Sequence, residues 1–449
     1  MAPALPALSA DQQAAWAAAA ALLRGSGVDL DAGSAEEAEP DRPRTVLAVT
    51  GRAGSGKSLL LAALTGALRE AGVAAVSPDW AFRKRERRSF AVLAPTNKAA
   101  SVLRARGVPA TTIHRILYTP VYDPAFERVA RWLAGEGDRP EAGPLTGAQL
   151  DRARASFDGH GSIPAALAAA GLRGSDFITG WTRREDPLDI GLVDEASMLD
   201  ARALDDLQAI FPTLLLFGDP AQLPPVQGQG GMVFEALPPA QRRDLTRVHR
   251  QEADSPILDL SEALWDPALG FEDFEDLLRG AAARDPRVQV TGRADADLMA
   301  RSPMLVWRNA TRIRLIHAWR LHVVGAEEPQ VSAASIVRIE REGEEEPFIP
   351  YAAQMGATFL HGAAVTIHKA QGSQWDTVQV FAPDLYAAAR SGRAEAGQPL
   401  WKRLAYVAIT RAARDLRWVV ASRLARPAAP LSVEDLGGTP GALALEAEE

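Results

Sequence analysis

The sequence contains no cysteine among its 449 residues. Disulfides, Cys-ligated zinc sites and iron–sulfur clusters are therefore excluded, and the composition fits the reducing cytoplasm. Long hydrophobic runs are also missing: the Ala-rich stretch 14–23 is too short to span a bilayer, and neither Lys nor Arg precedes it. We expect a helix that begins after Ser9 there rather than a signal peptide, and a cytoplasmic protein with no membrane partner.

An excess of positive charge is lacking as well, since 49 Lys and Arg face 57 Asp and Glu and the formal net charge is −8. No overall basic field draws this chain to nucleic acid, although a local basic channel is compatible with the same balance. The chain is longer than one ordinary hydrophobic core requires, so about two to four domains are expected.

What the chain does have is a glycine-rich phosphate-loop pattern. The sequence GxxxxGKS spans residues 51–58, after the strand-like run 45–49 and before the helix-like run 59–64. Glycines let the backbone N–H groups turn toward phosphate oxygens, and the helix N-terminus adds positive potential. Lys57 can reach the β- and γ-phosphates and Ser58 can ligate Mg²⁺, which predicts a nucleotide hydrolase. The residues expected to bind the nucleotide are Gly51, Ala53, Gly54, Ser55, Gly56, Lys57 and Ser58.

Continuous apolar runs predict an α/β fold, because strands buried on both faces of a parallel sheet show no alternation. Such runs lie at 45–49, 90–94, 190–193 and 214–217, and in the second half at 304–307, 362–366, 377–381 and 416–420. We expect a first domain at 1–240 with an inserted subdomain at about 118–187, a second domain at 241–436 with a small β-rich insertion at about 322–361, and a flexible tail at 437–449.

Acidic and amide side chains follow two of the predicted strands. Asp194 and Glu195 end the run 190–193, where a carboxylate at the carboxyl edge of a parallel sheet faces the ligand crevice. Asp194 is expected to hold Mg²⁺, and Glu195 to accept a proton from the attacking water or to orient it. Gln222 follows the run 214–217 and is expected to read the γ-phosphate.

Taken together, these segments resemble the motif set of superfamily 1 DNA helicases, in the RecD/Dda-like branch. The motifs stand in order over nearly the whole chain and comprise Gly51–Ser58, Ala94–Ala100, Thr112–His114, Asp194–Met198, Gly218–Val226, Val248–Gln251, Val365–Gly372 and Tyr406–Ala412. The resemblance implies two RecA-like P-loop domains, parallel sheets flanked by helices, with ATP in the cleft between them and single-stranded DNA across the top.

The resemblance also implies roles around the nucleotide. Arg250 and Arg411 match the two arginines that reach the γ-phosphate in the family, where they stabilise charge on the transferring group. Gln12 matches the adenine-reading glutamine, but Ser9 and Gln12 also form a capping-box pattern, so both interpretations stay open. Gln374 stands where many relatives have a ribose-binding Glu; an amide can still bind a ribose hydroxyl, which predicts altered nucleotide affinity rather than lost activity.

DNA contacts are expected on four strand-to-helix turns that face away from ATP. Backbone N–H groups, hydroxyls and cations there suit phosphates, which give affinity without sequence reading. The residues are Pro95, Thr96, Lys98, Thr112, His114, Trp307, Asn309, Thr366, His368 and Lys369.

The resemblance therefore implies an ATP- and Mg²⁺-dependent DNA helicase that moves 5′→3′ on single-stranded DNA. Its expected partners are single-stranded DNA, single/double-strand junctions and replication or repair proteins. The inserted segment 118–187 is where a strand-separating pin is expected. Two alternatives stay open, a translocase that strips proteins from DNA and a non-catalytic DNA-binding subunit. The intact Lys57, Glu195, Arg250 and Arg411 argue against the second of these.

Overall fold

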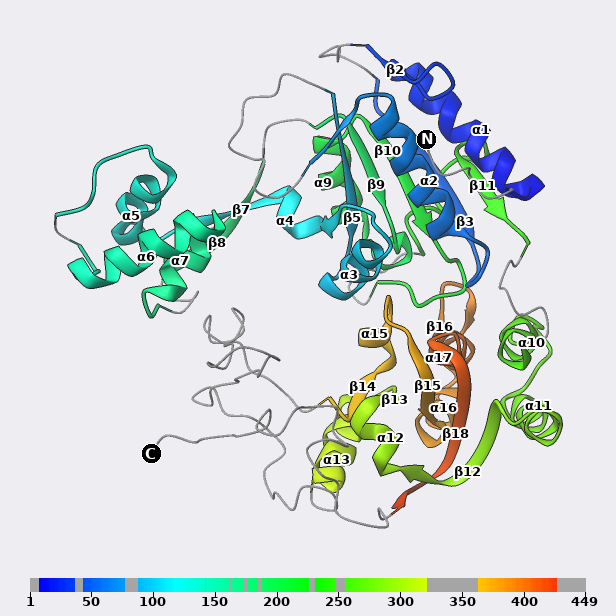
Figure 1. Cartoon of the computed structure of the whole chain (residues 1–449). Coiled ribbons are helices and arrows are strands. Elements are labelled where there is room, and N and C mark those ends of the chain that lie inside the picture. The colour runs from blue at the N-terminus through cyan, green and yellow to red at the C-terminus, as the bar shows by residue number, and fades with distance from the viewer. Residues whose placement is uncertain are drawn as a thin grey trace.

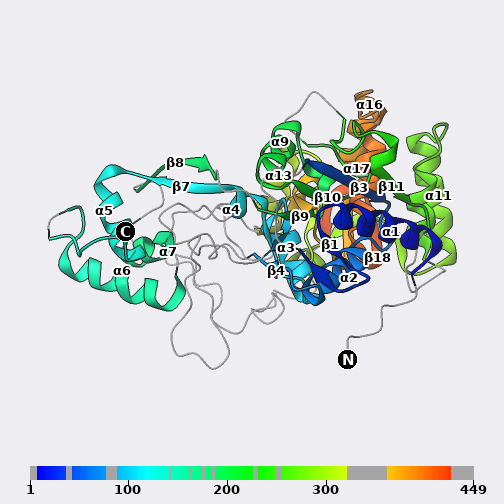
Figure 2. The same cartoon turned by 90° about the horizontal axis from the view of Figure 1, so that it is seen from above.

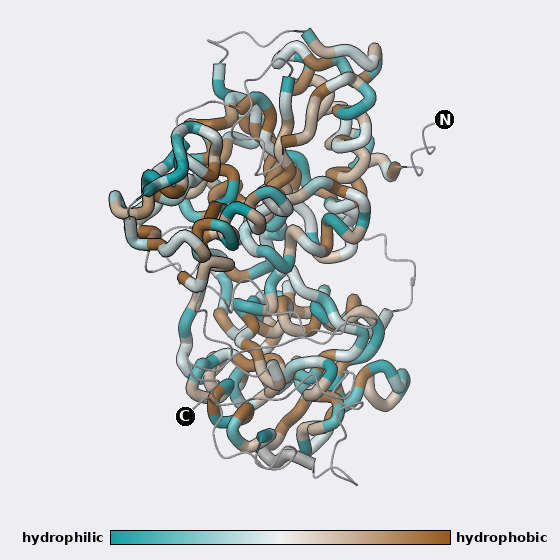
Figure 3. The backbone as a smooth tube through the Cα atoms, turned by 60° about the vertical axis from the view of Figure 1, so that its left-hand side comes forward, coloured by the Kyte–Doolittle hydropathy of each residue, from teal (hydrophilic) through white to brown (hydrophobic). Residues whose placement is uncertain are grey.

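The computed structural model describes residues 8–36, 43–76, 88–141, 143–161, 163–172, 177–184, 188–225, 231–247, 255–320 and 362–425. The chain contains two sheets of parallel strands, in two domains that lie one above the other in Figure 1. A helical subdomain projects from the upper domain. Seen from above, this subdomain stands apart from the stack of sheets (Figure 2). Hydrophobic stretches gather inside both stacked parts (Figure 3).

The first sheet has seven parallel strands in the order β11-β3-β10-β9-β5-β4, with β6 paired to β5. The strands are β3 Thr45–Gly51, β4 Ala74–Ala75, β5 Ser89–Ala94, β6 Ala110–Thr112, β9 Ile190–Val193, β10 Thr213–Gly218 and β11 Arg242–Leu245. β5, β9 and β10 are buried along their whole length, which explains why the sequence there is apolar without alternation.

Helices cover both faces of this sheet. The helices α1 Ala10–Gly25, α2 Lys57–Glu70 and α3 Asn97–Ala105 share one hydrophobic cluster with the sheet. On the other face lie α4 Ile113–Leu117 and α9 Ala201–Ile210. Small elements complete the domain: the hairpin β1 Val28–Asp29 with β2 Ser34–Ala35, and the short 3₁₀ helices η2 Ala196–Met198 and η3 Pro239–Gln241.

The second sheet has five parallel strands in the order β12-β18-β15-β13-β14. They are β12 Val288–Asp295, β13 Met304–Val306, β14 Ala364–Thr366, β15 Trp375–Phe381 and β18 Ala412–Ala425. One face packs on α10 Pro256–Ala263, α11 Phe271–Arg284, α15 Ile367–Ala370, α16 Ala382–Arg390 and α17 Leu400–Ile409, the other on α12 Ala296–Arg301 and α13 Asn309–Trp319. A short hairpin, β16 Ala394–Glu395 with β17 Gln398–Pro399, precedes α17.

The inserted subdomain has a hydrophobic core of its own. The antiparallel pair β7 Tyr118–Tyr122 and β8 Ile178–Arg183 forms its stalk, and α5 Pro124–Ala134, α6 Gly147–His160 and α7 Ile163–Ala169 pack beyond it. Phe126, Leu133 and Phe177 are among the buried residues of this core. Because the cluster is separate from those under the two sheets, the subdomain packs as a unit.

The predicted α/β fold class with two RecA-like domains is confirmed, but one boundary is wrong. β11 follows residue 240, where the sequence predicted the first domain to end, yet it pairs with β3 in the first sheet. The boundary therefore lies after β11. The predicted insertion at 322–361 and the tail at 437–449 lie outside the described residues. No helix among the described residues is long and apolar enough to cross a membrane.

Candidate functional site between two domains

The phosphate loop joins β3 to α2 as the sequence predicts. Gly54 and Gly56 take left-handed backbone conformations, with φ of 84° and 85°, which glycine adopts at little cost. A Cβ atom on Gly56 would lie 2.2 Å from Nε2 of Gln12, so a side chain there would also push the Gln12 side chain away from the loop. Lys57 donates from Nζ to the carbonyl oxygens of Gly51 and Arg52. The loop therefore positions its own lysine at the N-terminus of α2.

Gln12 contacts the phosphate loop and also caps its own helix. Its Oε1 accepts the Ser9 N–H at 3.0 Å, the contact that the capping-box interpretation predicts. Its Nε2 donates to the carbonyl oxygen of Ser55 at 3.0 Å, and the residue is buried. Capping is thus present, and the adenine contact stays a prediction for a side chain that touches the loop.

Two carboxylates follow β9. Burial raises the pKa of Asp194 to about 7, and the negative charge of Glu195 adds to that shift. The positive charges of Lys57 and Arg106 act in the opposite direction. Glu195 has φ of 53°, a left-handed conformation that is uncommon for a residue with a Cβ and is often found at functional sites. The strand end therefore presents both carboxylates in a constrained geometry.

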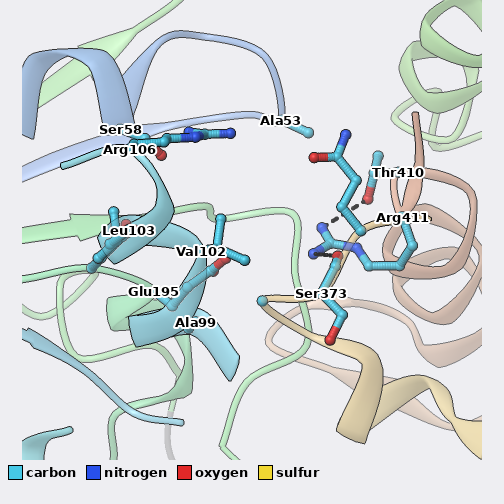
Figure 4. A pocket seen from close by; sticks show the side chains of 13 residues that line it. Ala53, Ser58, Ala99, Val102, Leu103, Arg106, Glu195, Ser373, Thr410 and Arg411 are labelled. Atoms are coloured by element: carbon cyan, nitrogen blue, oxygen red, sulfur yellow. Dashed lines mark hydrogen bonds between the residues drawn. The ribbon is translucent and has the colours of Figure 1, made fainter. Parts of the chain in front are cut away.

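A cavity of about 130 Å³ brings these groups together with the second domain. Ser58, Asp194 and Glu195 line it from the first domain, and Gln374 and Arg411 line it from the second. Figure 4 shows Arg411 and Ser373 from the second domain in the same cavity as Ser58, Arg106 and Glu195 from the first. The remaining lining residues are Ala53, Ala99, Val102, Leu103, Gly372 and Thr410.

Arg411 is buried, and contacts from its own domain orient it. Nε donates to the Val407 carbonyl at 3.1 Å, and Nη1 to the Ser373 carbonyl at 3.2 Å. Nη2 donates to Thr410 Oγ1 at 3.2 Å (Figure 4). A guanidinium held in this way presents a fixed positive charge to the cavity, as a group that stabilises a transferring phosphoryl must. Arg250, its predicted counterpart, lies outside the described residues.

The cavity also contains a cation that the sequence pattern does not single out. Arg106 follows α3, lines the cavity and acts electrostatically on Asp194. Its sequence context, the polar end of an amphipathic helix before Gly107, is typical of a solvated surface residue. Only the packing of α3 beside the end of β9 makes it a cavity residue.

The donor set fits the predicted Mg²⁺ contact. Ser58 and Asp194 line one cavity, and a hydroxyl and a carboxylate are oxygen donors of the kind that Mg²⁺ prefers. Among the described residues no three His, Asp or Glu side chains gather into a metal-binding cluster. Mg²⁺ usually takes one or two protein ligands and completes its shell with substrate phosphates and water, so a larger cluster is not required.

Gln222 lies at the contact between the domains and is not among the cavity-lining residues. Its Oε1 accepts from Ser197 Oγ at 3.3 Å and from Gln371 Nε2 at 3.4 Å. The Gln371 Nε2 also donates to the Leu223 carbonyl at 3.2 Å. Gln222 thus connects the segment after β9 to the second domain, while its γ-phosphate role stays a prediction.

Two predicted DNA-contacting turns lie side by side at the carboxyl ends of β5 and β6, which pair with each other. Pro95, Thr96 and Lys98 follow β5, and Thr96 Oγ1 accepts the Ala99 N–H to cap α3. Thr112 ends β6, and His114 follows in α4. The His114 ring lies 4.4 Å from the ring of Trp181 on β8, which is half-exposed. The first domain thus presents one continuous edge that includes the base of the inserted subdomain.

The other two turns follow the paired strands β13 and β14 of the second domain. Trp307 and Asn309 follow β13; Thr366 ends β14, and His368 and Lys369 lie in α15. Burial lowers the pKa of His368, so this imidazole is predominantly neutral near pH 7. The second domain therefore offers an exposed cation in Lys369 beside a neutral histidine.

The two predicted DNA-contacting surfaces meet at a close approach. A Cβ on Gly372, whose φ is 70°, would lie 2.9 Å from the Cβ of Ala99 in α3. The segment after α15 in the second domain therefore packs directly on α3, the helix that follows the first predicted DNA-contacting turn.

Comparison with known proteins gives two family matches. The family model described as an AAA domain matches residues 37–279, more than half of the chain, and the one described as a UvrD-like helicase C-terminal domain matches residues 361–419. A search of curated proteins gives no match.

Similar solved structures include helicases. The Pif1 helicase from Candida albicans shares 15% identity, with 93% of this chain and 95% of that chain covered and a TM-score of 0.43. The Bacteroides Pif1 bound to single-stranded DNA shares 14% identity, with 93% of each chain covered and a TM-score of 0.44. The Bacteroides Pif1 in complex with ADP-AlF3 and single-stranded DNA shares 14%, with 88% and 91% covered and a TM-score of 0.38.

Proposed function

We propose that this chain, which belongs to the AAA-domain family and matches the UvrD-like helicase C-terminal domain over residues 361–419, is a superfamily 1 helicase of the RecD/Dda-like branch. It couples ATP hydrolysis to 5′→3′ translocation on single-stranded DNA and to unwinding of duplex DNA. The observation that supports this most strongly is the cavity lined by Ser58, Asp194 and Glu195 from one domain and by Arg411 from the other.

Residues that line the cavity, together with Lys57 of the phosphate loop and Arg250, have separate roles in the proposed hydrolysis. Lys57 neutralises charge on the β- and γ-phosphates, and Arg411, with Arg250, stabilises the transferring phosphoryl group. Glu195 orients the attacking water or accepts its proton. Ser58 and Asp194 would hold Mg²⁺, which would supply further charge neutralisation on the phosphates. Because these groups come from both domains, full activity requires the cleft to close.

The DNA edge offers a way to turn closure into movement. Two turns belong to each domain, and each pair follows two neighbouring strands. Opening and closing of the cleft changes the distance between the two pairs of turns. Each cycle of ATP hydrolysis therefore moves one pair of DNA contacts along the strand. Contacts to phosphates suit this role, because they hold the strand without reading its sequence.

The inserted subdomain is the candidate for the strand-separating pin. Trp181 presents an aromatic surface that is 50% exposed, at the stalk of the subdomain and next to His114 on the predicted DNA edge. An exposed aromatic side chain can stack on an unpaired base. We infer a role at the single/double-strand junction for this stalk.

We further propose a cytoplasmic role in DNA repair, recombination or replication, together with proteins of those processes. The absence of cysteine is the feature of the sequence that fits the reducing cytoplasm.

The proposal is tested by strand displacement on a duplex with either a 5′ or a 3′ single-stranded tail, with ATP and Mg²⁺. Unwinding from the 5′ tail alone is the expected result. Unwinding from the 3′ tail alone would contradict the direction. DNA-stimulated ATP hydrolysis without unwinding would indicate a translocase that displaces proteins.

A further inference from the structure

One tyrosine hydroxyl joins three parts of the molecule across the domain boundary. Tyr406 lies in α17 of the second domain. Its Oη accepts the N–H of Ala53 in the phosphate loop at 2.8 Å and donates to Asp219 Oδ2, after β10, at 2.8 Å. Both partners belong to the first domain. A single hydroxyl group therefore fixes the distance between α17 and two nucleotide-site segments.

The adjacent residue of the phosphate loop makes a second contact of the same kind. The Arg52 guanidinium lies over the Trp265 ring, 4.4 Å from its centroid. The Trp265 and Tyr406 rings lie edge to face with centroids 6.5 Å apart. Two consecutive loop residues, Arg52 and Ala53, thus rest on one aromatic pair of the second domain.

The contact between the Tyr406 hydroxyl and Asp219 is buried, and both oxygens of the carboxylate accept a hydrogen bond. Tyr406 is 2% exposed and Asp219 is fully buried, and the other Asp219 oxygen accepts the Ala221 N–H at 2.9 Å. Burial first, and then the charge of Asp219, raises the pKa of Tyr406 well above its usual value. The hydroxyl therefore stays protonated and keeps its role as donor to the carboxylate. Removing it would leave a buried carboxylate oxygen and a loop N–H without this partner.

α17 connects this contact to the catalytic arginine. Thr410 Oγ1 accepts from Arg411 Nη2 and donates to the carbonyl oxygen of Tyr406 at 2.8 Å. On the same helix, Arg403 Nη1 donates to the carbonyl oxygens of Pro220 and Gln222. The helix therefore holds the segment after β10, the phosphate loop and Arg411 in one rigid arrangement.

We propose that Tyr406 is a positioning residue of the ATPase site, which sets the phosphate loop against Arg411 when the domains close. The inference rests on the proposed ATP-driven function and adds to it the element that links closure to catalysis. The hydroxyl acts on the geometry of the loop and not on the nucleotide itself.

The test is Tyr406→Phe, which keeps the ring and deletes the hydroxyl. With single-stranded DNA present, kcat for ATP is expected to fall about ten- to a hundredfold, because small misplacements of catalytic groups have effects of this size. The Kd for a fluorescent ADP analogue is expected to change less than about threefold, since most loop contacts remain. A purely structural role would lower the Tm and would not separate kcat from Kd in this way.

Three further variants make the result specific. Tyr386→Phe removes a hydroxyl from the exposed side of α16 and is expected to leave kcat unchanged. In an Asp219→Asn background, Tyr406→Phe is expected to lower kcat much less than it does alone, because the two residues act as one unit. If Tyr406→Phe fails to fold, Arg52→Gln, which removes the guanidinium contact with Trp265, is expected to lower kcat in the same direction, by about threefold or more.

The outcomes for the variants and for the wild type distinguish the positioning role of Tyr406 from the proposed ATP-driven function. Active wild-type protein with unchanged kcat in Tyr406→Phe would overturn the positioning role alone, as would unchanged kcat in Arg52→Gln if the tyrosine variant is unfolded. Wild-type protein that does not hydrolyse ATP with single-stranded DNA would overturn the proposed function and the positioning role together.

Discussion

The strand-to-helix turns after β3 and after β13 differ in the partner that is offered to their backbone N–H groups. After β3, Gly54 and Gly56 adopt left-handed conformations and the turn lines a cavity at Ala53 and Ser58. After β13, the turn contains no glycine. There the N–H groups of Trp307 and Arg308 donate to the buried carboxylate of Asp384 at 3.0 and 2.9 Å.

The difference shows how one architecture serves two purposes. A turn whose N–H groups can reach an external anion binds phosphate, whereas a turn that already contains a carboxylate of its own chain becomes a rigid platform. Arg308 and Thr311 also contact Asp384, and the Arg308 and Arg393 guanidinium groups each lie 6.0 Å from the Trp307 ring. The second domain thus uses its turn to orient predicted DNA contacts.

The largest expected effect is that of Lys57→Ala, which removes the cation from the first turn. ATP hydrolysis is expected to be abolished, because the charge on the β- and γ-phosphates loses its main counterion, while single-stranded DNA binding is kept. Steady-state ATPase and DNA-binding assays measure both. The matched control is Arg69→Ala, at the far end of α2, which should hydrolyse ATP normally; unchanged turnover in Lys57→Ala would refute the site assignment.

Arg411→Ala tests the contribution of the second domain to the same cavity. We expect kcat to fall by about 10³-fold, the lower end of the range for arginines that stabilise phosphoryl transfer, with a smaller change in KM. Pre-steady-state ATP turnover with single-stranded DNA measures this effect. A change confined to KM would show that Arg411 binds the ground state only.

Asp384→Asn tests the internal carboxylate of the second turn. The substitution removes the charge that pairs with Arg308 and turns one oxygen into a donor that faces other donors. Unfolding free energy is expected to fall by about 1–3 kcal/mol, and single-stranded DNA binding should weaken while ADP affinity is retained. Denaturant titration with nucleotide-binding controls checks this. Loss of ADP affinity equal to the loss of DNA affinity would argue against a separate role for this turn.

The smallest expected effect concerns Asp11, another carboxylate that binds backbone N–H groups and is more exposed than Asp384. Asp11 accepts the N–H groups of Thr246 and Arg247 at 2.9 Å each. Burial alone would raise its pKa, but hydrogen bonds from the Ser9 hydroxyl and the backbone outweigh it and lower the pKa to about 2. Since this lies below the unfolded-state value of about 3.9, ionised Asp11 stabilises the fold above roughly pH 4, and that contribution is lost as the pH falls toward 2.

The measurement is the Tm difference between wild type and Asp11→Asn at several pH values. The wild type should be more stable at about pH 7, and the difference should shrink below about pH 4. A difference that grows as the pH falls would show that the sign of this assignment is wrong.

The sequence predicts the fold well where the residues of one short segment are sufficient to identify a strand. The runs at 90–94, 190–193 and 214–217 are strands within a residue of their predicted bounds, because burial on both faces of a parallel sheet requires apolar residues throughout. β11 is missed because its residues Arg242, Arg243 and Asp244 are polar, as an edge strand allows.

The candidate site likewise contains some residues that the sequence identifies and others that only the fold reveals. The pattern of the phosphate loop and of Asp194-Glu195 is local, so the sequence identifies these residues without the fold. The cavity positions of Arg106 and the bridging hydroxyl of Tyr406 depend on contacts between residues that are far apart in the chain. All residues of α17 are buried, including Lys402 and Arg403, and no periodicity distinguishes the Tyr406 hydroxyl from the rest of the helix.

The most direct test of the central claim, that the interdomain cavity is the ATPase site of a DNA motor, is ATP hydrolysis by wild type and Glu195→Gln with and without single-stranded DNA. The substitution keeps the shape of the side chain and removes its capacity to accept a proton. We predict that DNA stimulates the wild type, and that Glu195→Gln binds ATP and DNA but turns over at least about a hundredfold more slowly. Wild-type turnover by Glu195→Gln would contradict the claim.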